Sequence, residues 1–168
     1  MSSTVTLDPV LPAAVPAETS PRARGCTGLR LRSLTRLVTR HYDAALAAAG
    51  LRLTQYTLLS YLKSSGEIAH TALAHALGMD RTTLTRNLRP LVEAGWIAQQ
   101  KSSTDARATT LSLTDAGHQQ WQQARPLWRT AQDSLNDTLG HQRVIDLHRL
   151  LEDSIEILSS GEPRKTGA

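Results

Sequence analysis

Cysteine and aromatic residues are scarce in this sequence. Cys26 is the only cysteine, so no disulfide can form within the chain, which excludes a secreted disulfide-stapled scaffold. Phenylalanine is absent and aromatic residues make up 4% of the chain, although hydrophobic residues reach 40%. We therefore expect a core of Leu, Ala, Val and Ile, which suits packed helices.

Several other signals are missing. No apolar run approaches the roughly 20 residues that span a membrane, and the N-terminus lacks the charged and apolar segments of a signal peptide. There is no Gly-rich phosphate loop and no nucleophile motif, and the six histidines are dispersed. The sequence therefore predicts a cytoplasmic protein that is not an enzyme and has no catalytic residues, cofactor, metal site or membrane contact.

Positive charge is concentrated in two segments of this basic chain, whose net charge is +4. Residues 22–40 carry six Arg and no acid, and residues 81–107 carry five basic residues against two acids. Residues 114–160 instead carry seven acids against four Arg. This distribution favours one surface that meets the phosphates of a nucleic acid, although solvated helix faces would give a similar count.

Hydrophobic periodicity predicts a mainly α-helical chain of 168 residues. Helices are expected from about 27 to 49, from a cap at Thr54 to about 63, from Thr71 to 77, and from 81 to 94 behind an Asp80 N-cap. Two short strands, 96–100 and 108–113, should follow. Long helices from about 115 to 139 and 141 to 159 carry heptad-like apolar seams, which are more than one small monomer needs and predict a homodimer.

The helices at 71–77 and 81–94 are joined by residues 78–80, a tight Gly-containing turn typical of a helix-turn-helix. The second helix of such a pair lies in the major groove of DNA. Arg can read guanine, Asn can read adenine, and a Thr methyl can contact thymine. The predicted DNA-binding residues of this helix are Arg81, Thr82, Thr83, Thr85, Arg86, Asn87 and Arg89.

The polar tip between the two strands is the second candidate DNA contact. Arg107 could enter the minor groove, and Asp105 could hold it by a charge-assisted hydrogen bond. Lys101 completes the candidate wing residues.

Taken together, these segments resemble the MarR (multiple-antibiotic-resistance regulator) family over about residues 27–158. The resemblance rests on residues 53–59, 73–79, 81–86, 91–97, 105–107 and 113–117. It implies a winged helix-turn-helix with a helical dimerisation region, and a homodimer that binds pseudo-palindromic double-stranded operator DNA as a repressor. The family's wing often has a second Arg after the first, whereas this chain has Thr109, Thr110 and Ser112 there.

The resemblance also implies a small-molecule effector. Within the family, this sequence is most similar to regulators of aromatic-acid degradation, including those of nicotinate breakdown. A small aromatic carboxylate would be held between the dimerisation helices and the winged domain, by an Arg or His at the carboxylate and a Trp against the ring. Candidate residues are Arg30, Arg40, His41, Tyr42, Gln55, Tyr61, Trp121 and Trp128. Core packing is the competing interpretation of the two Trp residues, and that of His41 is a helix histidine whose hydrogen bonds are satisfied within the protein.

Two alternatives stay open. Cys26 lies near several Arg residues that favour its thiolate, so a redox-sensing regulator is one of them. The other is a winged-helix module for protein–protein contacts. The expected organisation is an arm at 1–25, a dimerisation region at 26–50 and 114–160, a DNA-binding domain at 51–113, and a flexible tail at 161–168.

Overall fold

Helices dominate residues 25–101 and 109–161, the part of the chain that the computed structural model describes. The sequence's low aromatic content is matched by a core rich in leucine. In chain order the elements are α1 (Thr27–Leu46), the 3-10 turn η1 (Ala47–Ala49), α2 (Leu53–Ser65), β1 (Ile68–Ala69), α3 (His70–Ala76), α4 (Arg81–Glu93), β2 (Ile97–Lys101), β3 (Thr109–Leu113), α5 (Asp115–Leu139) and α6 (His141–Ser160).

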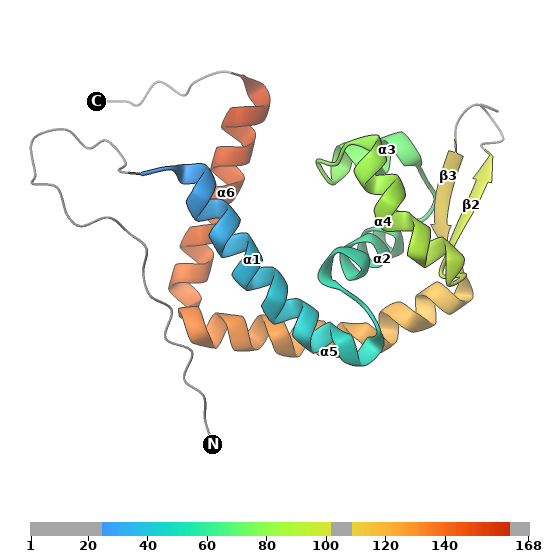
Figure 1. The fold of residues 1–168 in the computed structure, drawn as a ribbon, viewed down its shortest axis with the longest axis horizontal. Helices are drawn as coiled ribbons and strands as arrows, with labels where there is room; N and C mark the ends of the chain where they lie inside the picture. Colours follow the sequence, from blue (N-terminus) through green and yellow to red (C-terminus); the bar gives the residue numbers. More distant parts are fainter. Residues whose placement is uncertain (1–24, 102–108, 162–168) are drawn as a thin grey trace, which may run out of the picture.

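Helix α5 links two ends of the molecule. Figure 1 shows α2, α3, α4 and the sheet at one end of α5, with α1 and α6 toward the other. Helix α1 packs along α5, where His41 Nε2 lies 2.8 Å from the Ala131 carbonyl oxygen and the Tyr42 hydroxyl donates to Gln132 Oε1 at 2.5 Å. These bonds tie the helical end to the helix that leaves the sheet.

The sheet is antiparallel, with β3 between β1 and β2. Leu111 of β3 pairs with Ile68 on one side and with Gln99 on the other. The sequence predicted β2 and β3, but it missed β1. A strand of two residues is too short to show the alternation that identifies longer strands.

Leucines from several elements meet in one core under α4. Leu84, Leu88 and Leu91 form its buried face, as the periodicity predicted. They belong to one cluster with fully buried leucines of α2, α3 and β3, namely Leu58, Leu59, Leu62, Leu73 and Leu111. Burying a leucine contributes about 1.5–3 kcal/mol, so this cluster fixes which face of α4 points outward.

Two predicted helix ends were wrong. The first helix ends at Leu46 and continues only as the 3-10 turn. Thr54 does not cap α2, which begins one residue earlier. The Leu53 N–H instead donates to Asp43 Oδ1 at 2.7 Å, and the Arg52 N–H donates to Gln55 Oε1 at 2.9 Å. A carboxylate from α1 thus supplies a cap that local sequence does not reveal.

The order of elements is that of a winged helix-turn-helix. Helices α3 and α4 meet across a short turn in which Gly78 has a φ of +60°, a conformation that glycine adopts without strain. Strands β2 and β3 follow directly. The fold class predicted from the sequence, mainly α with a winged helix-turn-helix, is confirmed.

Candidate nucleic-acid interface

The start of α4 is fixed by Asp80, as predicted. Asp80 Oδ1 accepts from the Thr83 backbone N–H at 2.8 Å, and Asp80 Oδ2 accepts from the Thr83 hydroxyl at 2.7 Å. The hydrogen bond from the Thr83 side chain, followed by those from backbone N–H groups, lowers the pKa of the Asp80 carboxyl. Because the Thr83 hydroxyl is bound to Asp80, the methyl group is the part of this side chain that is left to contact a ligand.

The seven predicted α4 residues lie opposite or beside the buried leucines. Five of them are exposed and two are half-buried. Those exposed are Arg81, Thr82, Thr85, Arg86 and Arg89, and those half-buried are Thr83 and Asn87. The helix therefore presents a continuous polar surface, here called the α4 face, carrying three guanidinium groups and no acid among these seven residues.

The arginines of the α4 face differ in their partners. Arg89 Nε lies 2.7 Å from Glu93 Oε1, and this hydrogen bond and the carboxylate charge raise the pKa of Arg89. The pair is exposed, so it adds little to stability. Arg86 makes no hydrogen bond or ion pair with another residue of the described part of the chain. The Arg86 guanidinium is therefore available to an anionic ligand, whereas that of Arg89 already binds Glu93.

Of the predicted wing residues, Lys101 alone lies within the described residues. It is the last residue of β2, is exposed, and pairs with Thr109 across the ladder. Asp105 and Arg107 lie outside the described residues. So do most of the predicted arm and all but Gly161 of the predicted tail.

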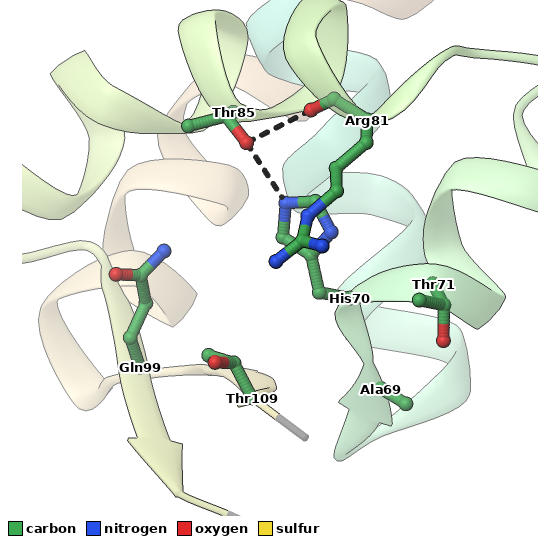
Figure 2. A pocket seen from close by; sticks show the side chains of 7 residues that line it. All are labelled: Ala69, His70, Thr71, Arg81, Thr85, Gln99 and Thr109. Atoms are coloured by element: carbon green, nitrogen blue, oxygen red, sulfur yellow. Dashed lines mark hydrogen bonds between the residues drawn. The ribbon is translucent and has the colours of Figure 1, made fainter. Parts of the chain in front are cut away.

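A hollow of about 260 Å³ separates α4 from the sheet. Figure 2 shows Arg81 and Thr85 of α4 on one side, with Gln99 and Thr109 of the strands across from them and His70 between. Its lining residues, here called the α4–sheet hollow, are Ala69, His70, Thr71, Arg81, Thr85, Gln99 and Thr109. Five of these were not predicted as site residues, because they come from four elements whose packing the sequence does not show: Ala69, His70, Thr71, Gln99 and Thr109.

A second hollow of about 690 Å³ lies on the other flank of α4. Arg86 and Asn87 line it together with Arg52 and Gln55 at the start of α2. Arg52 is a further basic residue beside the α4 face that was not predicted. Its position follows from the α2–α4 packing and not from any local motif.

The predicted effector residues do not gather in one pocket. Several are engaged within the protein: His41 and Tyr42 bind α5, and Gln55 accepts from the backbone of Arg52. Trp128 stacks on Tyr56 with ring centroids 5.7 Å apart. Tyr61 is half-buried, Arg40 is exposed, and the Arg30 guanidinium lies next to Gly25.

Trp121, one of the predicted effector residues, lies beside two arginines of α5. Its Nε1–H donates to Ser60 Oγ at 3.0 Å, which orients the ring. The Arg125 guanidinium carbon lies 5.6 Å from the ring centroid, within cation–π range. A shallow hollow of about 450 Å³ is lined there by Trp121, Gln122, Arg125, Pro126 and Arg129, here called the Trp121 hollow. The i, i+4, i+8 spacing of Trp121, Arg125 and Arg129 could have identified it.

The described residues contain no group of three or more His, Cys, Asp and Glu residues placed to hold a metal ion. No described helix is both long and apolar enough to cross a membrane. Cys26 is exposed just before α1.

Known proteins share both the sequence pattern and the fold. The sequence profile of the MarR family matches residues 51–109. The transcriptional repressor MprA of Escherichia coli K12 is 37% identical over 76 residues, which cover 44% of this chain and 43% of the repressor. PecS, an HTH-type transcriptional regulator of Dickeya dadantii, is 29% identical over 84 residues, or 48% of this chain and 51% of PecS. The chain thus matches about half the length of these curated relatives.

Solved structures match over more of the chain. The Mycobacterium tuberculosis transcriptional regulator MosR, crystallised with DNA, is 30% identical with a TM-score of 0.65, and the match covers 77% of this chain and 98% of MosR. The transcriptional repressor CouR, bound to a 23-mer DNA duplex, is 25% identical with a TM-score of 0.72, covering 77% of this chain and 92% of CouR. MosR is thus a transcriptional regulator and CouR a transcriptional repressor. On the profile match, the identity to MosR and the shared fold, this chain belongs to the MarR family.

Proposed function

We propose that this protein is a transcriptional repressor that binds pseudo-palindromic double-stranded DNA as a homodimer. The observation that carries the proposal is the α4 face, a polar surface with three guanidinium groups on a helix that its leucines and Asp80 hold in place. MosR and CouR were both solved with DNA. In this proposal residues 51–113 bind DNA, while residues 26–50 and 114–160 form the dimer.

A salt-titrated binding assay tests the proposal. Duplexes are first selected from a random pool and then compared with an unselected duplex. Neutralising several phosphates releases counterions, so affinity should fall on the order of 10³-fold between about 50 and 200 mM salt. In the dimer the two α4 helices should meet successive major grooves, about 34–36 Å apart. Failure to enrich any sequence, or an affinity insensitive to salt, would contradict it.

The apolar surface of α1 and α6 supports the dimer. Val144, Leu147 and Leu151 line an almost wholly apolar hollow of about 280 Å³ between α1, α5 and α6. Ile155 and Leu158 continue the same stripe of α6, yet they are 64% and 83% exposed. Large apolar side chains gathered on one end of a chain mark an association surface. More of them lie on the two helices: Leu29, Leu31, Leu37, Ile145 and Leu150.

A charge placed on this stripe should break the dimer. We expect Leu158→Asp or Ile155→Asp to shift the protein from dimer to monomer in light scattering, because an interface cannot bury an unpaired carboxylate. Ser159→Asp, which adds the same charge beside the stripe, should remain dimeric. A dimer that survives both substitutions would place the interface elsewhere.

The effector in this proposal is a small aromatic carboxylate, such as a nicotinate-pathway catabolite, that releases the DNA. The Trp121 hollow is where a ring could stack on Trp121 while Arg125 or Arg129 binds the carboxylate. A ligand that binds the DNA-free state better lowers DNA affinity by the ratio of its two affinities, commonly about 5–150-fold.

The effector assay measures release of the selected duplex by nicotinate, benzoate and salicylate. We expect at least one to lower DNA affinity about tenfold. Arg125→Ala should weaken that response, whereas Arg143→Ala on α6 should not. A response that Arg125→Ala leaves unchanged would remove the Trp121 hollow from the proposal.

A further inference from the structure

His70 is the first residue of α3 and reaches across to α4. Its Nε2 lies 3.2 Å from the Thr85 hydroxyl oxygen, and that hydroxyl donates to the Arg81 carbonyl oxygen at 2.8 Å. Figure 2 shows this chain of two hydrogen bonds at the edge of the α4–sheet hollow. The imidazole thus joins the end of β1 to the first turn of the helix that carries the α4 face.

The geometry determines which ring nitrogen carries the proton. Thr85 has one hydroxyl hydrogen, and it is used on the Arg81 carbonyl, so the Thr85 oxygen must accept from an Nε2–H of His70. His70 Nδ1 is buried and, among the described residues, has no hydrogen-bond partner. An orphaned buried N–H is rarer in proteins than an orphaned acceptor, so Nδ1 holds a lone pair. Both observations assign the neutral Nε2–H form.

We propose that His70 is a positioning residue for α4. Through the Nε2–H···Thr85···Arg81 chain, it fixes the orientation in which the first turn of this helix meets DNA. This inference rests on the proposed DNA-binding function. His70 itself need not touch DNA. It acts through Thr85 and Arg81, two members of the α4 face, and a hydrogen bond at their base restricts the orientations from which they reach a groove.

The charges around His70 keep it neutral. Burial, and then the positive charge of Arg81, lower the pKa of His70 below its ordinary value of 6.5. Apart from Arg81, the residues that line the hollow with His70 are uncharged: Ala69, Thr71, Thr85, Gln99 and Thr109. No described acid lines the hollow, so nothing there offsets the cost of a protonated ring.

Spectroscopy of the free protein tests the assignment without DNA. In ¹⁵N-edited NMR at neutral pH, His70 should show the Nε2–H tautomer, and Thr85→Val should change the tautomer balance. An Nδ1–H tautomer, or no change on Thr85→Val, would overturn the proposal. Because no DNA is present, this result is independent of whether the proposed function holds.

A double-mutant cycle on the selected duplex tests the positioning role. The amide nitrogen of Gln reaches the place of Nε2, whereas that of Asn reaches only the place of Nδ1. We therefore expect His70→Gln to keep affinity within about twofold and His70→Asn to lose about fivefold, the effect of one hydrogen bond. In a Thr85→Val background, His70→Asn should cause no further loss. Affinity for an unselected duplex should not change.

Two outcomes would overturn the role. The first is equal losses for the Gln and Asn variants, which would indicate packing rather than a hydrogen bond. The second is additive effects of His70→Asn and Thr85→Val, which would show that His70 does not act through Thr85. If the wild-type protein binds no duplex, the proposed function fails, and the NMR result still decides the hydrogen-bond chain.

The neutral form of His70 should also make the stability of the protein depend on pH. Because the folded-state pKa of His70 is lowered, the unfolded chain binds more protons than the folded protein as pH falls below 6.5. The stabilisation is complete above pH 6.5 and is lost as pH falls toward the folded-state pKa. Between pH 7.5 and 5 the urea midpoint should therefore fall further for wild type than for His70→Gln. An equal fall in both proteins would contradict the neutral imidazole.

Discussion

Replacing Arg86 with alanine is expected to lower affinity for the selected duplex by about 10–100-fold, the value of one bidentate contact to a base. Arg86 is exposed on the outward side of α4, two residues before the buried Leu88 and two after Leu84. It has no hydrogen-bond or ion-pair partner among the described residues, so the loss reports a missing contact to DNA and not a disturbed fold. Titration of the variant against selected and unselected duplexes measures it.

Arg89→Ala is the matched control for Arg86. Arg89 lies on the same helix, with its Nε 2.7 Å from Glu93 Oε1, and we expect it to contact phosphate rather than a base. Its loss should weaken binding to both duplexes alike, whereas Arg86→Ala should weaken the selected duplex more. Arg86→Lys, which keeps the charge but loses the planar fork, should recover only part of the preference. Equal effects of Arg86→Ala on both duplexes would assign Arg86 to the DNA backbone.

The α4 face could be predicted because everything that defines it lies within fourteen consecutive residues. Asp80 sets the start of the helix, the spacing of Leu84, Leu88 and Leu91 sets its buried face, and the polar residues follow on the other side. Helical periodicity and capping are local properties, so the sequence carries them directly. For the same reason α5 begins at residue 115 as predicted, behind Thr114, whose hydroxyl oxygen accepts from the Gly117 N–H at 3.0 Å.

Features formed between distant segments could not be predicted in this way. The start of α2 depends on Asp43 of α1, and β1 exists because two residues pair with β3. The α4–sheet hollow joins residues from 69 to 109, and His70 acquires its role only through contact with Thr85. The predicted effector residues do not gather in one pocket, because some of them already bind other parts of the protein. Their spacing in the sequence could not show that His41 and Tyr42 make hydrogen bonds to α5.

Substituting alanine for Gly117 is expected to destabilise the protein by about 3 kcal/mol, at the upper end for overpacking. Gly117 lies in the first turn of α5, where a Cβ would overlap the Trp96 carbonyl oxygen and approach Leu113 Cδ2 to 3.2 Å. The Trp96 carbonyl cannot withdraw freely, because it accepts from the Thr114 N–H at 3.1 Å. The Thr114 hydroxyl in turn donates to the Gly95 carbonyl oxygen at 2.7 Å. The turn before β2 and the start of α5 would have to separate.

Thermal and urea unfolding of Gly117→Ala measure the effect, and a loss of this size should lower the Tm by roughly 6–12 °C in a chain of this length. Gly28→Ala is the matched control, because Gly28 also lies in the first turn of a helix. The nearest atom to its added Cβ is Cys26 Sγ at 3.8 Å, an ordinary contact. Removing a helical glycine there should stabilise the protein by about 0.5–1 kcal/mol. Stability changes of opposite sign for the two variants would show that Gly117 is required by the close approach of the Trp96 carbonyl and not by helix propensity. Equal stability changes would refute the packing of α5 against the turn before β2.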